Sequence, residues 1–206
     1  MKDLVHALYA LLAPWLILSL VLTGRNPRPS LRRMLLSASL GLLILLIPLG
    51  KFPICRWIAV LEPNPSITLT ALLAIALIAR GGGRRFFRPQ DWRAAWISGS
   101  IAALILYPMG LGLTSLDPYT WGWGPVIPIA TTAPAVMFLL GGNRFGIVLL
   151  LCLIGMLFPP MESHNSWDAL IDPFYAFLSL IITALLVFRI PLISVPPASP
   201  SERGDG

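Results

Sequence analysis

The chain has 206 residues, of which 56% are hydrophobic and only 12% are charged, and its mean hydropathy is +0.80. A soluble domain carries roughly 25% charged residues, so this composition excludes an ordinary soluble domain and indicates an integral membrane protein. Spans of about 20 residues each use nearly all of the length. We therefore expect one transmembrane helical domain over residues 1–190, followed by a disordered cytoplasmic tail, rich in proline and serine, over residues 191–206.

The net charge of +6 does not indicate a nucleic-acid partner. The basic residues stand in short clusters between apolar runs, which is the distribution found where Lys and Arg hold loops on the cytoplasmic side of a membrane. We therefore interpret the charge as a sign of topology. The expected partners are the lipid bilayer and another membrane protein, with no nucleic acid.

Apolar runs alternate with short polar breaks and predict an all-α bundle of seven transmembrane helices. The first run, residues 4–23, exceeds the apolar region of a signal peptide, which has about 7–15 residues, and no small-residue cleavage site follows it. Six spans are the alternative if residues 52–66 re-enter the bilayer. The remaining predicted helices are 34–50, 66–79, 95–115, 125–141, 145–159 and 174–190.

The basic residues divide unequally between the two sides of this map. Twelve of the fifteen fall in the loops 24–33, 80–93 and 142–144 and in the tail. Basic loops stay in the cytoplasm, so the N-terminus is expected outside and the C-terminus inside. The pattern suits a multi-pass protein of the bacterial inner membrane. The three basic residues expected on the periplasmic side are Lys2, Lys51 and Arg56.

Several spans are short or interrupted by proline at their outer ends. The run 67–79 covers about 20 Å of a roughly 30 Å hydrocarbon core, so it must draw in residues 62–66 to span fully. Pro108 interrupts the fourth span, and Pro128 and Pro134 interrupt the fifth. Proline frees backbone carbonyls that neighbours or water must satisfy, which predicts a wet indentation at these ends. Bilayer thinning is the alternative explanation.

Familiar catalytic motifs are absent from the sequence. There is no phosphate-binding Gly-x-x-x-x-Gly-Lys, no His-Glu-x-x-His and no Gly-x-Ser-x-Gly. Cys55 and Cys152 are expected at different depths, too far apart for a disulfide. The sequence therefore predicts no bound metal and no cofactor.

The outer loops gather the polar residues that are candidates for a site. Carboxylates and an imidazole suit general acid–base catalysis. Aromatic and amide side chains suit binding of a lipid headgroup or a lipid-linked saccharide. The candidate catalytic residues are Glu62, Asp117, Glu162, His164 and Asp168; the candidate substrate-binding residues are Asn64, Tyr119, Trp121, Trp123, Asn165 and Trp167.

The segment 162–173 has two interpretations. On a continuous helix, His164, Asp168 and Asp172 form one polar stripe at i, i+4 and i+8, which suits a general base or a metal ligand. Alternatively, Asn165 caps a short interfacial helix and Asp172 before Pro173 ends it. Tryptophans of the outer loops have the parallel alternative of an interfacial aromatic belt. Tyr107 is interpreted as a packed helix residue or, alternatively, as a catalytic acid.

Three functions are open at this stage. The first is a non-catalytic membrane subunit or scaffold of an envelope system that processes or transports lipid or polysaccharide, favoured by the small size. The second is a small membrane enzyme acting on a lipid or lipid-linked substrate at the periplasmic face. The third is a transporter or channel, which is weakened because the map places no Asp, Glu, Lys or His in mid-span.

Overall fold

The computed structural model describes residues 2–24, 29–81, 86–158 and 160–188, and within them the chain is mostly helical. The predicted all-α class is therefore confirmed. The α-helices are α1 (Lys2–Thr23), α2 (Leu31–Leu46), α3 (Ile54–Leu61), α4 (Ile67–Gly81), α5 (Pro89–Gly110), α6 (Val126–Leu140), α7 (Phe145–Leu157), α8 (Ser166–Leu170) and α9 (Pro173–Val187). A 3-10 helix, η1 (Pro118–Trp123), precedes α6, and β1 (Pro48–Leu49) pairs with β2 (Phe52–Pro53) in a small antiparallel hairpin.

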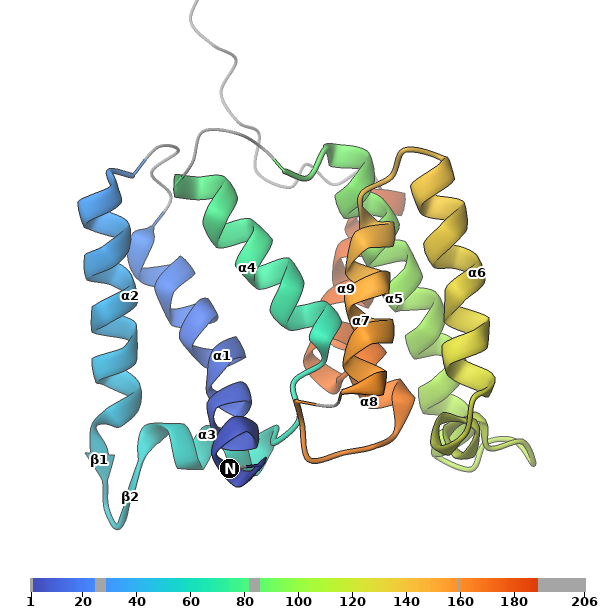
Figure 1. Cartoon of the computed structure of the whole chain (residues 1–206), viewed down its shortest axis with the longest axis horizontal. Helices are drawn as coiled ribbons and strands as arrows, with labels where there is room; N and C mark the ends of the chain where they lie inside the picture. Colours follow the sequence, from blue (N-terminus) through green and yellow to red (C-terminus); the bar gives the residue numbers. More distant parts are fainter. Residues whose placement is uncertain (1, 25–28, 82–85, 159, 189–206) are drawn as a thin grey trace, which may run out of the picture.

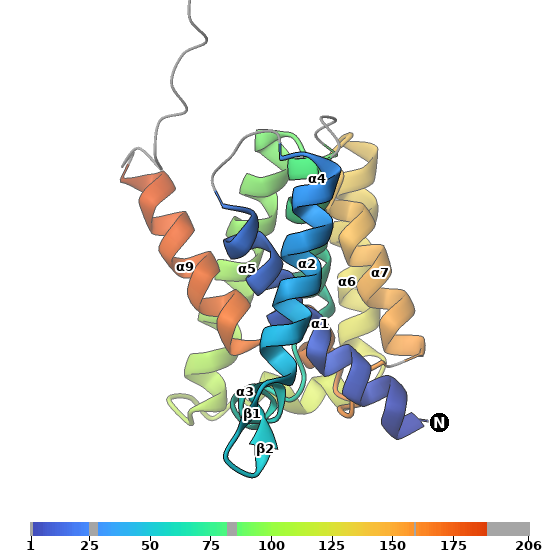
Figure 2. The same ribbon diagram turned by 90° about the vertical axis from the view of Figure 1, so that its left-hand side faces the viewer.

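The seven longer helices run between two ends of the molecule (Figure 1). The facing ends of α1 and α2, of α4 and α5, and of α6 and α7 lie at one end of the molecule, which we call the basic end. The hairpin, α3, η1 and α8 lie at the other, which we call the acidic end (Figures 1 and 2). Arg80 lies in the last turn of α4, and Arg88 and Arg144 directly precede α5 and α7 at the basic end. The connections of the acidic end carry Glu62, Asp117, Glu162, Asp168 and Asp172.

Each of the seven predicted helices overlaps one of these long helices, with shifted boundaries. Helix α2 begins three residues early because the Ser30 hydroxyl caps it by accepting from the Arg33 N–H. Helix α5 begins six residues early because Pro89 occupies its first turn and Asp91 caps it. Residues 62–66 do not extend α4, which begins at Ile67. The predicted disordered tail, 191–206, lies outside the described residues.

By length and composition, one helix of the described part is long and apolar enough to cross a membrane, over Leu4–Thr23. Helices α4, α6, α7 and α9 are apolar but have only 13 to 15 residues. At 1.5 Å per residue, a 15-residue helix is about 22 Å long, which is less than a hydrocarbon core of roughly 30 Å.

Small residues stand where the helices approach most closely. The main helix pairs are α5 with α9, α1 with α2, and α6 with α7. A Cβ atom at Gly99 of α5 would lie 2.3 Å from the Ser179 Oγ of α9, and one at Gly146 of α7 would lie 2.7 Å from the Ala135 carbonyl of α6. Close approach at small residues is the usual basis of helix packing inside membranes. Helices α4, α5, α6, α7 and α9 share a core that includes Leu72, Ala95, Phe145, Val148 and Tyr175.

Candidate functional site: a carboxylate pocket at the acidic end

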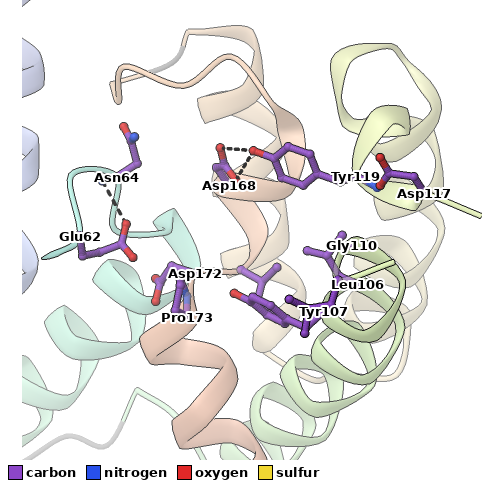
Figure 3. Close-up of a pocket in the computed structure, with 12 residues that line it drawn as sticks. Glu62, Asn64, Leu106, Tyr107, Gly110, Asp117, Tyr119, Asp168, Asp172 and Pro173 are labelled. Atoms are coloured by element: carbon purple, nitrogen blue, oxygen red, sulfur yellow. Dashed lines mark hydrogen bonds between the residues drawn. The ribbon is translucent and has the colours of Figure 1, made fainter. Parts of the chain in front are cut away.

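A cavity of about 440 Å³ opens at the acidic end between α5, η1, the α8–α9 junction and the α3–α4 connection (Figure 3). We call it the carboxylate pocket. Its volume lies within the range of small-molecule sites, roughly 300–1,000 Å³. Its lining consists of Glu62, Asn64, Leu106, Tyr107, Gly110, Leu111, Asp117, Tyr119, Asp168, Ile171, Asp172 and Pro173.

Asp172 forms the base of the pocket and is only 3% exposed. It stands directly before Pro173, a position that favours extended backbone and the start of a helix. One carboxylate oxygen caps α9 by accepting from the Tyr175 N–H at 2.8 Å, and the other accepts from the Ser66 N–H at 2.7 Å. Asp172 therefore joins α9 to the start of α4, although the two segments are 106 residues apart.

Glu62 and Asn64 supply the opposite wall. The Asn64 N–H donates to Glu62 Oε1 at 3.1 Å, and Asn64 Oδ1 accepts from the Glu162 N–H at 2.9 Å. Burial raises the pKa of Glu62 to about 7, and the negative charges of Asp172 and Asp168 add to the rise, while the Asn64 N–H opposes it. Glu62 therefore exchanges its proton near neutral pH, as a general acid or base requires.

Asp168 lies between two hydroxyl donors. Tyr119 Oη donates to its carboxylate oxygens at 3.1 and 3.2 Å, and the Ser163 hydroxyl donates to Oδ2. Burial raises the pKa of Tyr119 to about 12, helped by the charge of Asp168, so the phenol stays protonated as a donor. Figure 3 shows the Tyr107 hydroxyl pointing into the cavity towards Asp172. Both tyrosines thus border the carboxylates.

Asn165 and Trp167 hold the pocket's outer wall in place from behind. Asn165 is 2% exposed; its Oδ1 caps α8 by accepting from the Trp167 N–H, and its Nδ2 donates to the Tyr119 carbonyl at 3.0 Å. Trp167 Nε1 donates to the Pro118 carbonyl at 2.8 Å. A Cβ atom at Gly122 would lie 1.8 Å from Asn165 Oδ1, so η1 packs directly on this cap. Both residues position η1 and are not part of the lining.

The structure divides the predicted site residues into two groups. Glu62, Asn64, Asp117, Tyr119 and Asp168 line the carboxylate pocket together. Trp121 and Trp123 are 46% and 64% exposed and lie outside the lining, as does the exposed His164. Glu162 borders a separate cavity of about 320 Å³ with His6 and Arg56.

The interpretation of segment 162–173 as one continuous helix is wrong. Helix α8 covers only Ser166–Leu170, and Asn165 caps it as the alternative predicted. His164 lies before that helix, and Asp172 belongs to the start of α9, so the three residues do not form a stripe. The cause is Pro173, which starts a new helix and forces extended backbone at Asp172.

Asp172 and Tyr107 line the pocket but were not among the predicted site residues. The sequence offered Asp172 as a helix terminator or as part of a stripe with His164 and Asp168, and its contact with Ser66 depends on tertiary structure that the sequence does not display. Tyr107 had the two interpretations of a packed helix residue and a catalytic acid. The signal for Tyr107 was the break that follows it at Pro108. Tyr107 lies in the last turns of an interrupted span, on the side where the acidic residues gather. A polar side chain at such a position faces the indentation that the break predicts.

The pocket's electrostatics restrict what it can hold. Its lining contains four carboxylates and no Lys, Arg or His. Among residues 2–24, 29–81, 86–158 and 160–188, the one ion pair joins Arg88 and Asp91 at the other end of the molecule. The described residues contain no group of three or more His, Cys, Asp or Glu side chains that could hold a metal ion. The arrangement accepts hydrogen bonds from hydroxyl or ammonium groups and repels phosphate.

Searches of protein-family models, curated proteins and solved structures found no match to this chain.

Proposed function

We propose that the chain is a multi-pass protein of the bacterial inner membrane that binds the polar part of a lipid or lipid-linked saccharide at its periplasmic face. The supporting observation is the carboxylate pocket, a cavity of about 440 Å³ whose charged side chains are all acidic. A neutral sugar or an amine satisfies such acceptors without like-charge repulsion.

Apolar surface supports the multi-pass part of the proposal. Large apolar side chains are exposed along the outward faces of the helices, for example Ile129 at 68%, Phe177 at 65% and Leu104 at 64%. Soluble monomers rarely expose contiguous apolar patches of more than a few hundred Å². We therefore propose that α1, α2, α4, α5, α6, α7 and α9 are seven spans, and that the bilayer thins around the shorter ones.

Charge supports the proposed orientation. Arginines cluster in the connections of the basic end, and cytoplasmic loops carry an excess of Lys and Arg. The acidic end with its pocket then faces the periplasm. Helix α3 has eight residues, about 12 Å, which is too short to cross, so we propose that it lies along the interface and that six spans are not the topology.

A second candidate function is catalysis in the same pocket, and the observation that favours it is the pKa of Glu62, about 7. A carboxyl group that titrates near neutral pH, in the same pocket as the carboxylate of Asp168, is the arrangement expected of an acid–base pair acting on a hydroxyl group. The scaffold and transporter hypotheses stay predictions.

Binding is tested with purified protein in nanodiscs of neutral phosphatidylcholine. Titration with octyl glucoside headgroup analogues or ethanolamine, measured by thermal shift, should stabilise the protein. The double variant Glu62→Gln with Asp168→Asn should raise the apparent Kd about tenfold. The control Glu162→Gln changes an exposed carboxylate outside the pocket and should leave the apparent Kd unchanged. Equal responses of all three proteins would contradict the proposal.

A further inference from the structure

A second cavity lies below the carboxylate pocket, on the side of the molecule where α5 and α6 face each other. It has a volume of about 220 Å³, and we call it the lateral groove. Helix α5 packs mainly on α9 and helix α6 on α7, while neither packs extensively on the other in the described part of the chain. Small residues on the facing sides, Gly99 and Ala102 on α5 and Ala130 and Thr131 on α6, leave the space between them open.

The chemistry of the groove is that of a hydrocarbon site. No charged residue lines it. Two of its buried hydroxyls already have partners: Thr131 Oγ1 donates to the Ile127 carbonyl at 2.7 Å, and Tyr175 Oη donates to the Ala95 carbonyl at 2.6 Å. A polar occupant would lose its hydrogen bonds to water and regain few of them here, which is costly in an apolar setting. An alkyl chain makes no hydrogen bonds to water, so it loses none on entering the groove.

The dimensions and place of the groove match one chain of an outer-leaflet amphiphile. Along α6 the lining runs from Ile127, at the acidic end, to Phe138. Eleven residues at 1.5 Å each give about 16 Å, or roughly half of a 30 Å hydrocarbon core. The groove therefore starts at the end that carries the carboxylate pocket and runs for about the depth of one leaflet.

Helix α8 lies between the two cavities. Its Trp167 and Leu170 line the lateral groove, while Asp168 and the following Ile171 line the carboxylate pocket. One short helix thus presents an apolar side to the groove and an acidic side to the pocket. A molecule with a polar head and a hydrocarbon chain has the same two-part chemistry.

We infer that the lateral groove holds a hydrocarbon chain of the same amphiphile whose polar head occupies the carboxylate pocket. The inference rests on the proposed function and narrows its ligand to a membrane lipid or lipid-linked saccharide that remains anchored in the outer leaflet. The protein binds this ligand from within the bilayer, with the chain entering sideways between α5 and α6.

The test uses the full chain in nanodiscs with a glucosyl diacylglycerol that carries a photoactivatable diazirine near the end of one acyl chain. Mass spectrometry of crosslinked peptides should place the label on α6 and α7, near Phe138 and Leu149. Filling the groove with Ala130→Phe should lower this crosslinking about tenfold, equivalent to about 1.4 kcal/mol of binding free energy. Ala102→Leu provides a second filling variant, and Ala133→Phe, an exposed position of α6 outside the lining, is the matched control.

The pocket variant Glu62→Gln with Asp168→Asn separates this inference from the proposed function. Loss of crosslinking in both the groove variants and the pocket variant supports one amphiphile in both cavities. Loss in the pocket variant alone overturns the groove and leaves the headgroup site standing. Loss in the groove variants alone overturns the inference of one amphiphile in both cavities, because the probe's chain then binds without the carboxylate pocket, and no loss in either overturns both proposals.

Discussion

The basic end and the acidic end each contain one buried aspartate that joins segments far apart in the sequence. At the basic end, Asp91 is 0% exposed and accepts from the N–H groups of Arg88 and Arg144 at 2.7 and 3.0 Å. At the acidic end, Asp172 is 3% exposed and accepts from the backbone N–H groups of Ser66 and Tyr175. Asp91 thus links the start of α5 to the start of α7, and Asp172 links the start of α4 to the start of α9.

The surroundings of the two aspartates differ. Arg88 Nε lies 3.8 Å from Asp91 Oδ2, and the same guanidinium donates to the Gly142 carbonyl. The basic end therefore neutralises its buried charge and covers it. Asp172 borders a cavity whose other charged groups are also acidic. Burial, helped by repulsion from these carboxylates, raises the pKa of Glu62, a state that opposes stability and is typical of functional sites. One end therefore closes over its buried charge, whereas the other leaves its carboxylates lining an open cavity.

Removing either buried carboxylate should have the largest effect. Asp91→Ala and Asp172→Ala each leave two backbone N–H groups without their acceptor, and a hydrogen bond to a charged group contributes roughly 1.5–3 kcal/mol. We expect each substitution to lower the free energy of unfolding by about 3 kcal/mol, measured by thermal unfolding in mild detergent. A wild-type unfolding temperature in either variant would refute the described role of that residue.

Asparagine at the same positions should separate the two ends. Asp91→Asn removes the charge that pairs with Arg88, whereas Asp172→Asn removes a charge that repels Glu62. Both variants keep one side-chain acceptor. We expect Asp172→Asn to be less destabilising than Asp91→Asn by about 1 kcal/mol. The reverse order would show that the carboxylate pocket contains no net repulsion.

Glu62 should make the stability of the acidic end depend on pH. Its pKa is raised from 4.5 to about 7, so between these values the folded protein binds more protons than the unfolded chain. Stability contributed by this group is therefore complete below about pH 4.5 and is lost as pH rises towards 7. Unfolding temperatures measured from pH 4.5 to 8 should fall across this window in wild type and less steeply in Glu62→Gln. Parallel curves would contradict the shift.

The smallest effect is expected for Tyr119→Phe. The substitution removes the hydroxyl that donates to Asp168, while the Ser163 hydroxyl still donates to the same carboxylate. We expect a loss of about 0.5–1 kcal/mol in unfolding free energy. Thr120→Val, which removes a hydroxyl bonded only to the local Asp117 carbonyl, is the control for a hydroxyl of η1 that does not touch the pocket.

Sequence patterns predicted the long helices because apolar runs and capping residues are local signals. Four carboxylates of the pocket were visible as outer-loop residues for the same reason. The contacts that make them one site were not predictable: the Asp172–Ser66 hydrogen bond spans 106 residues, and the Asn165–Tyr119 bond spans 46. Short elements such as α3 and η1 were also missed, because a helix of six to eight residues completes only about two turns and is much shorter than the spans that the apolar runs indicate.

Topology provides the most direct test of the account, because both proposals require the acidic end to face the periplasm. Thr120 in η1 and Gln90 in α5 are exposed and lie at opposite ends of the bundle. Each is changed to Cys in a chain carrying Cys55→Ser and Cys152→Ser, and intact cells are treated with a maleimide that cannot cross membranes. We predict labelling of Thr120→Cys in intact cells and of Gln90→Cys only after permeabilisation. Labelling of Gln90→Cys in intact cells, with Thr120→Cys protected, would contradict the account.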